Sequence, residues 1–240
     1  MTDMSILYIV VCALITVPGV IFPGIFAIRD HKEEIKWGQN DRIQTQRIRI
    51  DRMSSEKAGR KYILFLVLCE VSATLQGWEC YMIKGSLDIF YAVFVSMMMS
   101  AVFMDLLWKE IYDFVWVIAL AAETAALFFG GGPDKMGLAS MAIYFVIQEA
   151  AMAKVYGRAD SHAFCCSAVA ITASGGGIEY YTLHMSVTWV LLAAVQTLRG
   201  NITKKLKLRQ PVAMVPYISF SLSIVMTVIQ LDGRDFVHFS

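Results

Sequence analysis

The sequence predicts an all-α, polytopic integral membrane protein: a helical bundle with about eight transmembrane helices and both termini outside. Three observations predict this class. Of the 240 residues, 57% are hydrophobic and 17% are charged, whereas a soluble domain carries about 25% charged residues. The apolar residues gather in runs near the length that a helix needs to cross about 30 Å of hydrocarbon. The basic residues gather in alternate connections between these runs. We therefore expect a multi-pass protein of the cell membrane.

The predicted spans follow one another from the first residues to the last. They cover residues 6–28, 61–79, 87–104, 114–130, 137–153, 162–175, 182–198 and 212–231. The sixth and seventh are separated only briefly, by the glycines 175–177 and by Glu179. Residues 1–61 are expected to form the first helix and a cytoplasmic loop, and residues 62–240 the main membrane region.

The orientation is predicted from Lys and Arg, which accumulate in short cytoplasmic loops. An outside N-terminus makes four segments cytoplasmic, namely 29–61, 105–113, 154–162 and 199–210. These segments hold 18 of the 21 basic residues, and only Lys84, Lys135 and Arg234 stay outside. This distribution predicts that both termini are outside and that Asp105 and Asp160 lie at the cytoplasmic face.

These two acids are the candidate catalytic residues. Acids in or beside membrane spans are rare and often functional, although either one alone could simply be a hydrated acid at a helix end. The two share one membrane side although 55 positions separate them, and Gly157 allows close approach of a neighbouring helix near Asp160. Two neighbouring carboxylates can share a proton, so that one activates water and the other polarises a peptide carbonyl. The pattern favours an aspartyl protease.

The stretch that begins at Asp105 resembles the first motif of the type IV prepilin peptidases. These are membrane aspartyl proteases with an Asp near the end of one helix and a GxGD motif before another. In their first motif, an aliphatic-Pro-Asn/Asp triplet follows the Asp by six to eight positions. Here Ile111 and Asp113 match this triplet, and Tyr112 stands in place of the proline.

Two further stretches carry the same resemblance. The run Gly-Arg-Ala-Asp-Ser-His at 157–162 resembles GxGDxK, with Ala159 for the second glycine and His162 for the lysine. Pro216 and Tyr217 open the last span after a basic loop, where the family carries a Gly-Pro-Phe/Tyr turn. The three motifs occur in the family's order, and the resemblance places a peptidase-like core at about 87–231.

The resemblance implies an aspartic-type endopeptidase that removes the short leader from prepilin-like precursors at the cytoplasmic face. Asp105 and Asp160 would be catalytic, and the supporting motif residues would be Gly157, Ala159, Ile111, Asp113, Pro216 and Tyr217. The expected partners are a precursor with a basic leader and an apolar helix, and the lipid bilayer. No nucleic acid and no cofactor are expected. Family members that also methylate pilin carry a cysteine-bearing domain between the first two spans, but residues 29–61 contain no cysteine, so methyl transfer is not expected.

Two alternatives remain open. A transporter-like subunit could use Glu123 and Glu149, which lie inside the fourth and fifth predicted spans. Their ordinary interpretation is inward-facing polar residues that hydrogen-bond partners such as Gln148 or Thr124. A second alternative is an inactive relative that acts in pilus assembly, because Ala159 adds a methyl group where the family has glycine.

A metal site is not expected. Asp160, His162 and Cys165 are ligand types, but zinc needs three or four convergent ligands, and His184 is predicted near the outer surface. The five cysteines show no CxxC spacing and are expected to be buried small residues.

Overall fold

The computed structural model describes residues 3–37, 56–84, 88–129, 133, 135–203 and 212–237. Within these ranges the chain is helical and contains no strand. The elements are α1 (Asp3–Trp37), α3 (Glu56–Lys84), α4 (Ile89–Leu107), α5 (Asp113–Phe129), α6 (Lys135–Ile147), the π-helix η1 (Gln148–Met152), α7 (Ala153–Tyr156), α8 (Arg158–Ala173), α9 (Ile178–Thr203) and α10 (Val215–Val237). The all-α prediction is confirmed.

Five helical segments of the described chain are long and apolar enough to cross a membrane. They are Ile9–Phe26, Ile89–Leu107, Lys135–Tyr156, Ile178–Leu198 and Val215–Asp232. A shorter apolar stretch, Ile63–Trp78, lies in α3. These segments indicate a membrane protein. The larger number of passes and the outside position of the termini stay predictions.

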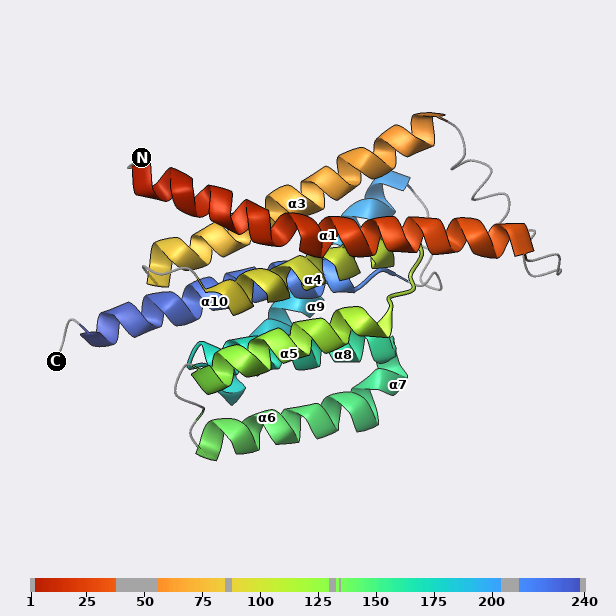
Figure 1. The fold of residues 1–240 in the computed structure, drawn as a ribbon. Coiled ribbons are helices and arrows are strands. Elements are labelled where there is room, and N and C mark those ends of the chain that lie inside the picture. The colour runs from red at the N-terminus through yellow and green to blue at the C-terminus, as the bar shows by residue number, and fades with distance from the viewer. Residues whose placement is uncertain are drawn as a thin grey trace.

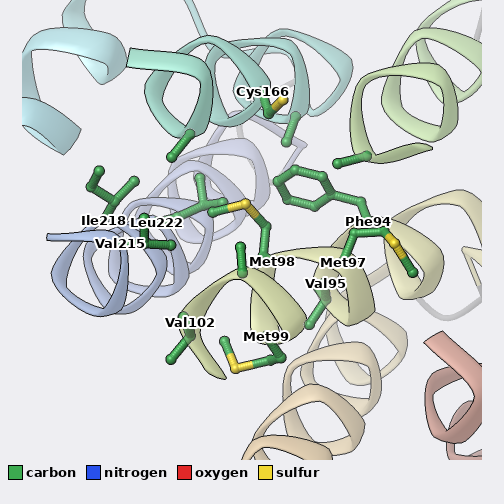
Figure 2. Close-up of a cluster of buried hydrophobic side chains, with 14 of the residues drawn as sticks. Phe94, Val95, Met97, Met98, Met99, Val102, Cys166, Val215, Ile218 and Leu222 are labelled. Atoms are coloured by element: carbon green, nitrogen blue, oxygen red, sulfur yellow. The ribbon is translucent and has the colours of Figure 1, made fainter. Parts of the chain in front are cut away.

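Helix α4 is the centre of the bundle. It packs against α1, α3, α5 and α10, and 78% of its apolar segment is buried. Figure 1 shows α4 among these helices, with α6 at the edge. The core lies where α4 faces α8 and α10: Phe94 and Met98 of α4 gather with Cys166 of α8 and with Ile218 and Leu222 of α10 (Figure 2).

Small and polar residues determine how α4 begins and how closely α1 approaches it. Asp88 caps α4, because its carboxylate accepts a hydrogen bond from the Tyr91 N–H at 3.0 Å. The Ser100 hydroxyl donates to the Gly19 carbonyl of α1 at 2.7 Å. A Cβ at Gly19 would lie 2.5 Å from Ser96 Cβ, which is too close for two side chains. Gly19 therefore permits the close helix contact that small residues provide in membranes.

Glu70 joins α1 to α3 within the apolar part of these helices. Its Oε1 accepts hydrogen bonds from Thr16 of α1 at 2.5 Å and from Thr74 of α3 at 3.1 Å. Hydroxyl-to-carboxyl bonds of this kind hold membrane helices together. Glu70 therefore has a structural role between α1 and α3.

The structure describes the two ends of segment 29–61, which the sequence predicts to be a cytoplasmic loop. Helix α1 continues to Trp37 and α3 already begins at Glu56, so both ends of that segment are helical. A charged sequence can extend a helix beyond the membrane, because hydropathy marks only the apolar part of a helix. Residues 38–55, and the basic stretch 204–210, lie outside the described residues.

Candidate active site

Asp105 lies in the last turn of α4 and turns toward the start of α10. Its side chain is buried, with 7% exposed, and its Oδ2 accepts a hydrogen bond from the Val215 N–H at 3.0 Å. Val215 is the first residue of α10, so this N–H has no partner inside its own helix. Asp105 therefore caps α10 across 110 positions of sequence.

Gly157 positions Asp160. Helix α7 ends at Tyr156, and Gly157 has φ 115° and ψ 158° before α8 begins. This backbone region is essentially restricted to glycine. The sharp reversal places Asp160 in the first turn of α8, where a negative charge faces the positive end of the helix dipole. The backbone conformation thus explains why the predicted motif has a glycine at this position.

The two acids lie at the same end of the bundle. Asp105 lies just before the connection that follows α4, and Asp160 lies just after the connection that precedes α8. Both connections are at the end of the bundle where α10 begins, opposite the end where α1 begins (Figure 1). Asp160 lies before the apolar part of α8. Burial and, to a smaller extent, the charge of Asp105 together raise the pKa of Asp160 to about 7. The charge of Asp105 therefore acts on Asp160, and the Asp160 carboxyl is partly protonated near neutral pH.

The supporting motif residues lie in α5, α8, α10 and the connections before α5 and α8. Ile111 is partly buried and packs against the core before α5 begins, and Asp113 is the exposed first residue of α5. Ala159 precedes Asp160 in the first turn of α8. Pro216 and Tyr217 lie in the first turn of α10, where a proline is tolerated because the missing N–H has no helical acceptor.

Tyr112, in the position of the family's proline, takes part in an aromatic cluster. Its ring centre lies 5.8 Å from that of Phe114 and 5.6 Å from that of Phe26 in α1. Lys109 in the same connection has a positive φ of 61°, which is uncommon for a residue with a side chain. The connection after Asp105 is therefore held by ring packing to α1 and α5.

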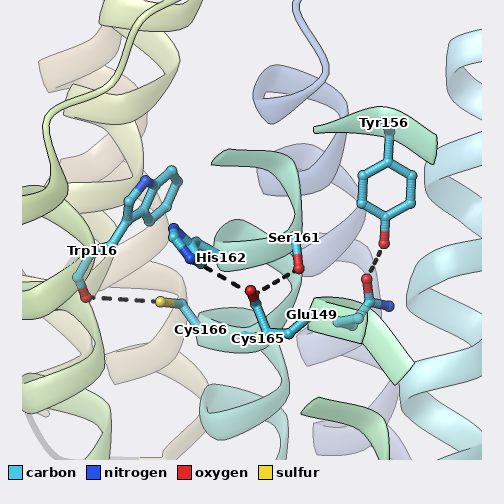
Figure 3. Close-up of polar contacts among 8 residues, drawn as sticks. Trp116, Glu149, Tyr156, Ser161, His162, Cys165 and Cys166 are labelled. Atoms are coloured by element: carbon cyan, nitrogen blue, oxygen red, sulfur yellow. Dashed lines mark hydrogen bonds and ion pairs between the residues drawn. The ribbon is translucent and has the colours of Figure 1, made fainter. Parts of the chain in front are cut away.

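Glu149 lies in a different environment from the one that the sequence predicts. Glu149 was expected to face inward and to bond Gln148 or Thr124, but its side chain is 44% exposed. Its Oε1 accepts a hydrogen bond from Ser161 at 2.8 Å and lies 3.7 Å from Nε2 of His162 (Figure 3). The helical reversal at Gly157 could have indicated that residues before it lie beside α8. The π-helix at Gln148–Met152, which sets the direction of Glu149, has no signal in the sequence.

Glu123 is buried in α5, with 1% exposed, so its inward direction is confirmed.

His184 differs from the prediction. It was expected near the outer surface, but its ring packs against Phe164 with centres 5.3 Å apart, and its Nε2 bonds the Ile218 carbonyl at 3.0 Å. Phe164 and Ile218 lie in the second turn of α8 and the first turn of α10. Helix packing, which hydropathy does not predict, moves His184 toward the Asp160 end.

The remaining metal-ligand types in the described chain do not converge. No group of three or more His, Cys, Asp or Glu residues there could hold a metal ion. The cysteines whose side chains are described are free and buried, as expected from the sequence: Cys12, Cys69, Cys165 and Cys166.

Comparisons with known proteins found no matching family model, no matching curated protein and no matching solved structure. The fold by itself indicates a helical membrane protein, and it places Asp105 and Asp160 at the same end of the bundle.

Proposed function

We propose that this chain is a membrane aspartyl endopeptidase that removes the short leader from prepilin-like precursors at the cytoplasmic membrane face. One observation carries the proposal. Asp105 of α4 and Asp160 of α8 lie at the same end of the bundle, and burial and the charge of Asp105 raise the pKa of Asp160 to about 7. Aspartyl proteases need such a pair, in which one carboxyl is ionised and the other is protonated at the same pH.

The hydrogen bond of Asp105 supports a division of roles. The Val215 N–H donates to its Oδ2, and a bond from the start of a helix favours the ionised form. Asp105 is therefore the base that takes a proton from water, and the resulting hydroxide attacks the peptide carbonyl. Asp160 gives its proton to the carbonyl oxygen. When the tetrahedral intermediate collapses, the C–N bond breaks, the leaving amine takes the proton held by Asp105, and one hydroxyl of the intermediate returns a proton to Asp160.

The substrate class follows from the place of the pair and from the three motifs. The acids lie at the end of apolar helices, so a peptide cut there has one part in the membrane and one part in water. A precursor with a basic leader and an apolar helix fits this geometry. Its helix would lie against the bundle, where side chains such as Leu183 and Val190 of α9 are exposed, and its leader would reach the cytoplasm.

The test is processing in cells. The chain is co-expressed with a set of pilin-like precursors, and the shift from precursor to mature pilin is followed on a gel. We expect processing by the wild type and loss of processing in Asp105→Ala and in Asp160→Ala. Processing that survives both substitutions would overturn the proposal. A wild type that processes none of the precursors would favour an inactive relative in pilus assembly.

A transporter-like subunit is the second candidate, because Glu123 is almost fully buried inside α5 and a buried acid in a membrane helix marks ion pathways in other proteins. Glu123→Gln separates the two. A peptidase that uses the aspartates retains processing in this variant. A phenotype that is lost in Glu123→Gln, with both aspartates dispensable, would favour the transporter.

A further inference from the structure

Gln148 and Glu149 of the π-helix η1 bond residues on the two sides of Gly157, where the chain reverses direction. Gln148 is fully buried, and its Oε1 accepts a hydrogen bond from the Tyr156 hydroxyl, directly before Gly157. Glu149 accepts a hydrogen bond from Ser161, directly after Asp160. Figure 3 shows the two contacts side by side. We call Gln148 and Glu149 the 148–149 clamp.

The contacts of Glu149 all fall on the first two turns of α8. Besides the Ser161 bond at 2.8 Å, its Oε1 lies 3.7 Å from Nε2 of His162 and 3.9 Å from Sγ of Cys165. Ser161 is fully buried, so its hydroxyl has no water to replace this bond. The contact therefore fixes the rotation of the helical turn that also carries Asp160.

The π-helix explains why neighbouring residues can reach both sides. A π turn contains an extra residue and shifts the faces of the helix beyond it. Gln148 thereby points to Tyr156 and to Met185 of α9, while Glu149 points to α8. Single π turns inside α-helices occur frequently at functional sites. Here the unusual turn lies beside the candidate active site.

We propose that Glu149 is a positioning residue: through Ser161 it holds the first turn of α8 so that Asp160 stays beside Asp105. The inference rests on the proposed function and extends it to a residue outside the three motifs. The titratable groups that face Glu149 are His162 and Cys165 of α8 and Tyr156 of α7.

The first test is a double-mutant cycle on processing rate. Because a displacement of about 1 Å at a reacting group can cost up to 100-fold in rate, we expect Glu149→Ala and Ser161→Ala each to lower processing about tenfold. The double variant should be no slower than either single variant, since both remove one hydrogen bond. Glu149→Gln retains an acceptor oxygen and should recover most of the rate. Glu179→Ala, an exposed acid in the first turn of α9, is the matched control and should not lower the rate.

The pH profile separates positioning from general loss of structure. If Asp160 moves away from Asp105, it loses the neighbouring charge that raises its pKa. In Glu149→Ala the high-pH limit of processing should therefore move to lower pH, whereas a smaller folded fraction would lower the rate equally at every pH. If Glu149→Ala does not fold, Ser161→Ala gives the same comparison. Additive losses in the cycle, or a Glu149→Gln variant as slow as Glu149→Ala, would overturn the proposal.

A second readout is independent of catalysis. In a full-length chain with Cys80→Ser, Asp105→Cys and Asp160→Cys, the rate of disulfide formation between positions 105 and 160 is followed by peptide mapping. A disulfide needs Cα atoms within about 7 Å, so we expect Glu149→Ala to slow its formation and Glu179→Ala to leave it unchanged. An unchanged rate in Glu149→Ala would contradict the positioning role. If the aspartates are dispensable for processing but disulfide formation is slower in Glu149→Ala, the proposed function is wrong and the positioning role of Glu149 is retained.

Discussion

Glu70 in α3 and Asp105 in α4 are both carboxylic acids in apolar helices, yet their surroundings differ. Glu70 accepts hydrogen bonds from the hydroxyls of Thr16 and Thr74, and these bonds join α1 to α3. Asp105 accepts a bond from the backbone of α10 and also interacts with a second acid, Asp160. Two acids whose charges act on each other oppose each other's ionisation, so the pair lowers stability near neutral pH. Such an arrangement is expected where chemistry needs it.

The largest expected effect is on catalysis. Asp105→Asn and Asp160→Asn should each lower processing by at least about 1000-fold, because members of a catalytic unit cannot replace one another. Glu70→Gln should stay within about threefold of the wild type, because Gln also accepts hydroxyl bonds and lies outside the pair. Initial rates with one purified precursor in detergent check this. Equal losses at Glu70 and at the aspartates would remove the distinction between the two sites.

The next effect is the pH dependence. In the proposed mechanism, processing needs the protonated form of Asp160, whose pKa is raised to about 7, so the rate should fall about tenfold per pH unit well above pH 7. The same shift acts on stability. The folded state holds this proton more tightly than the unfolded chain, whose Asp titrates near pH 4, so the free energy of unfolding falls as pH rises between these values.

This fall in stability should be absent in Asp160→Asn and unchanged in Glu70→Gln. Urea unfolding in detergent at a series of pH values measures it. A wild type whose stability relative to Asp160→Asn rises from pH 4 to 7 would show that Asp160 is ionised more easily in the folded state, which is contrary to the proposed acid.

A smaller effect is expected at Gly157. Its backbone angles are essentially restricted to glycine, so Gly157→Ala should cost about 1–3 kcal/mol of stability and, by moving Asp160, about tenfold in processing. Gly175 is the control, because it also has a positive φ, of 85°, and lies at the opposite end of α8 with open space around its Cβ position. Gly175→Ala should lower the melting temperature without lowering the processing rate of the folded protein. Equal rates in the two variants would remove the link between Gly157 and the site.

The smallest effects belong to the Glu70 site. Thr16→Val and Thr74→Val each remove one hydroxyl donor and should cost about 0.6 kcal/mol, and no more than about 1.7, the range of hydrogen bonds between membrane helices. Processing rates should not change. Thermal unfolding and the processing assay on the same preparations check both statements. A Thr16→Val variant that loses processing would connect the α1–α3 contact to the site.

Much of the helical framework could be predicted from the sequence, because a run of apolar residues near 20 long is itself the signal. The common end for Asp105 and Asp160 follows from alternating helix directions and needs no knowledge of contacts. The role of Glu149 could not be predicted, since a π turn is a local change in backbone register without a characteristic residue pattern. His184 was misplaced for a similar reason, because the position of a residue along its own helix does not reveal the tilt of that helix.

The sequence by itself determined the helical class, the order of the apolar segments and the two acids at helix ends. Only the tertiary structure decided which of these helices is central. Most of the apolar segment of α4 is buried, whereas only 11% of Lys135–Tyr156 and 17% of Ile178–Leu198 are buried. The compositions of these segments do not predict which of them is buried, because lipid is as apolar as a protein core and hydrophobicity does not select a partner helix. Close contacts such as Gly19 against Ser96, and hydrogen bonds such as Asp105 to Val215, select it instead.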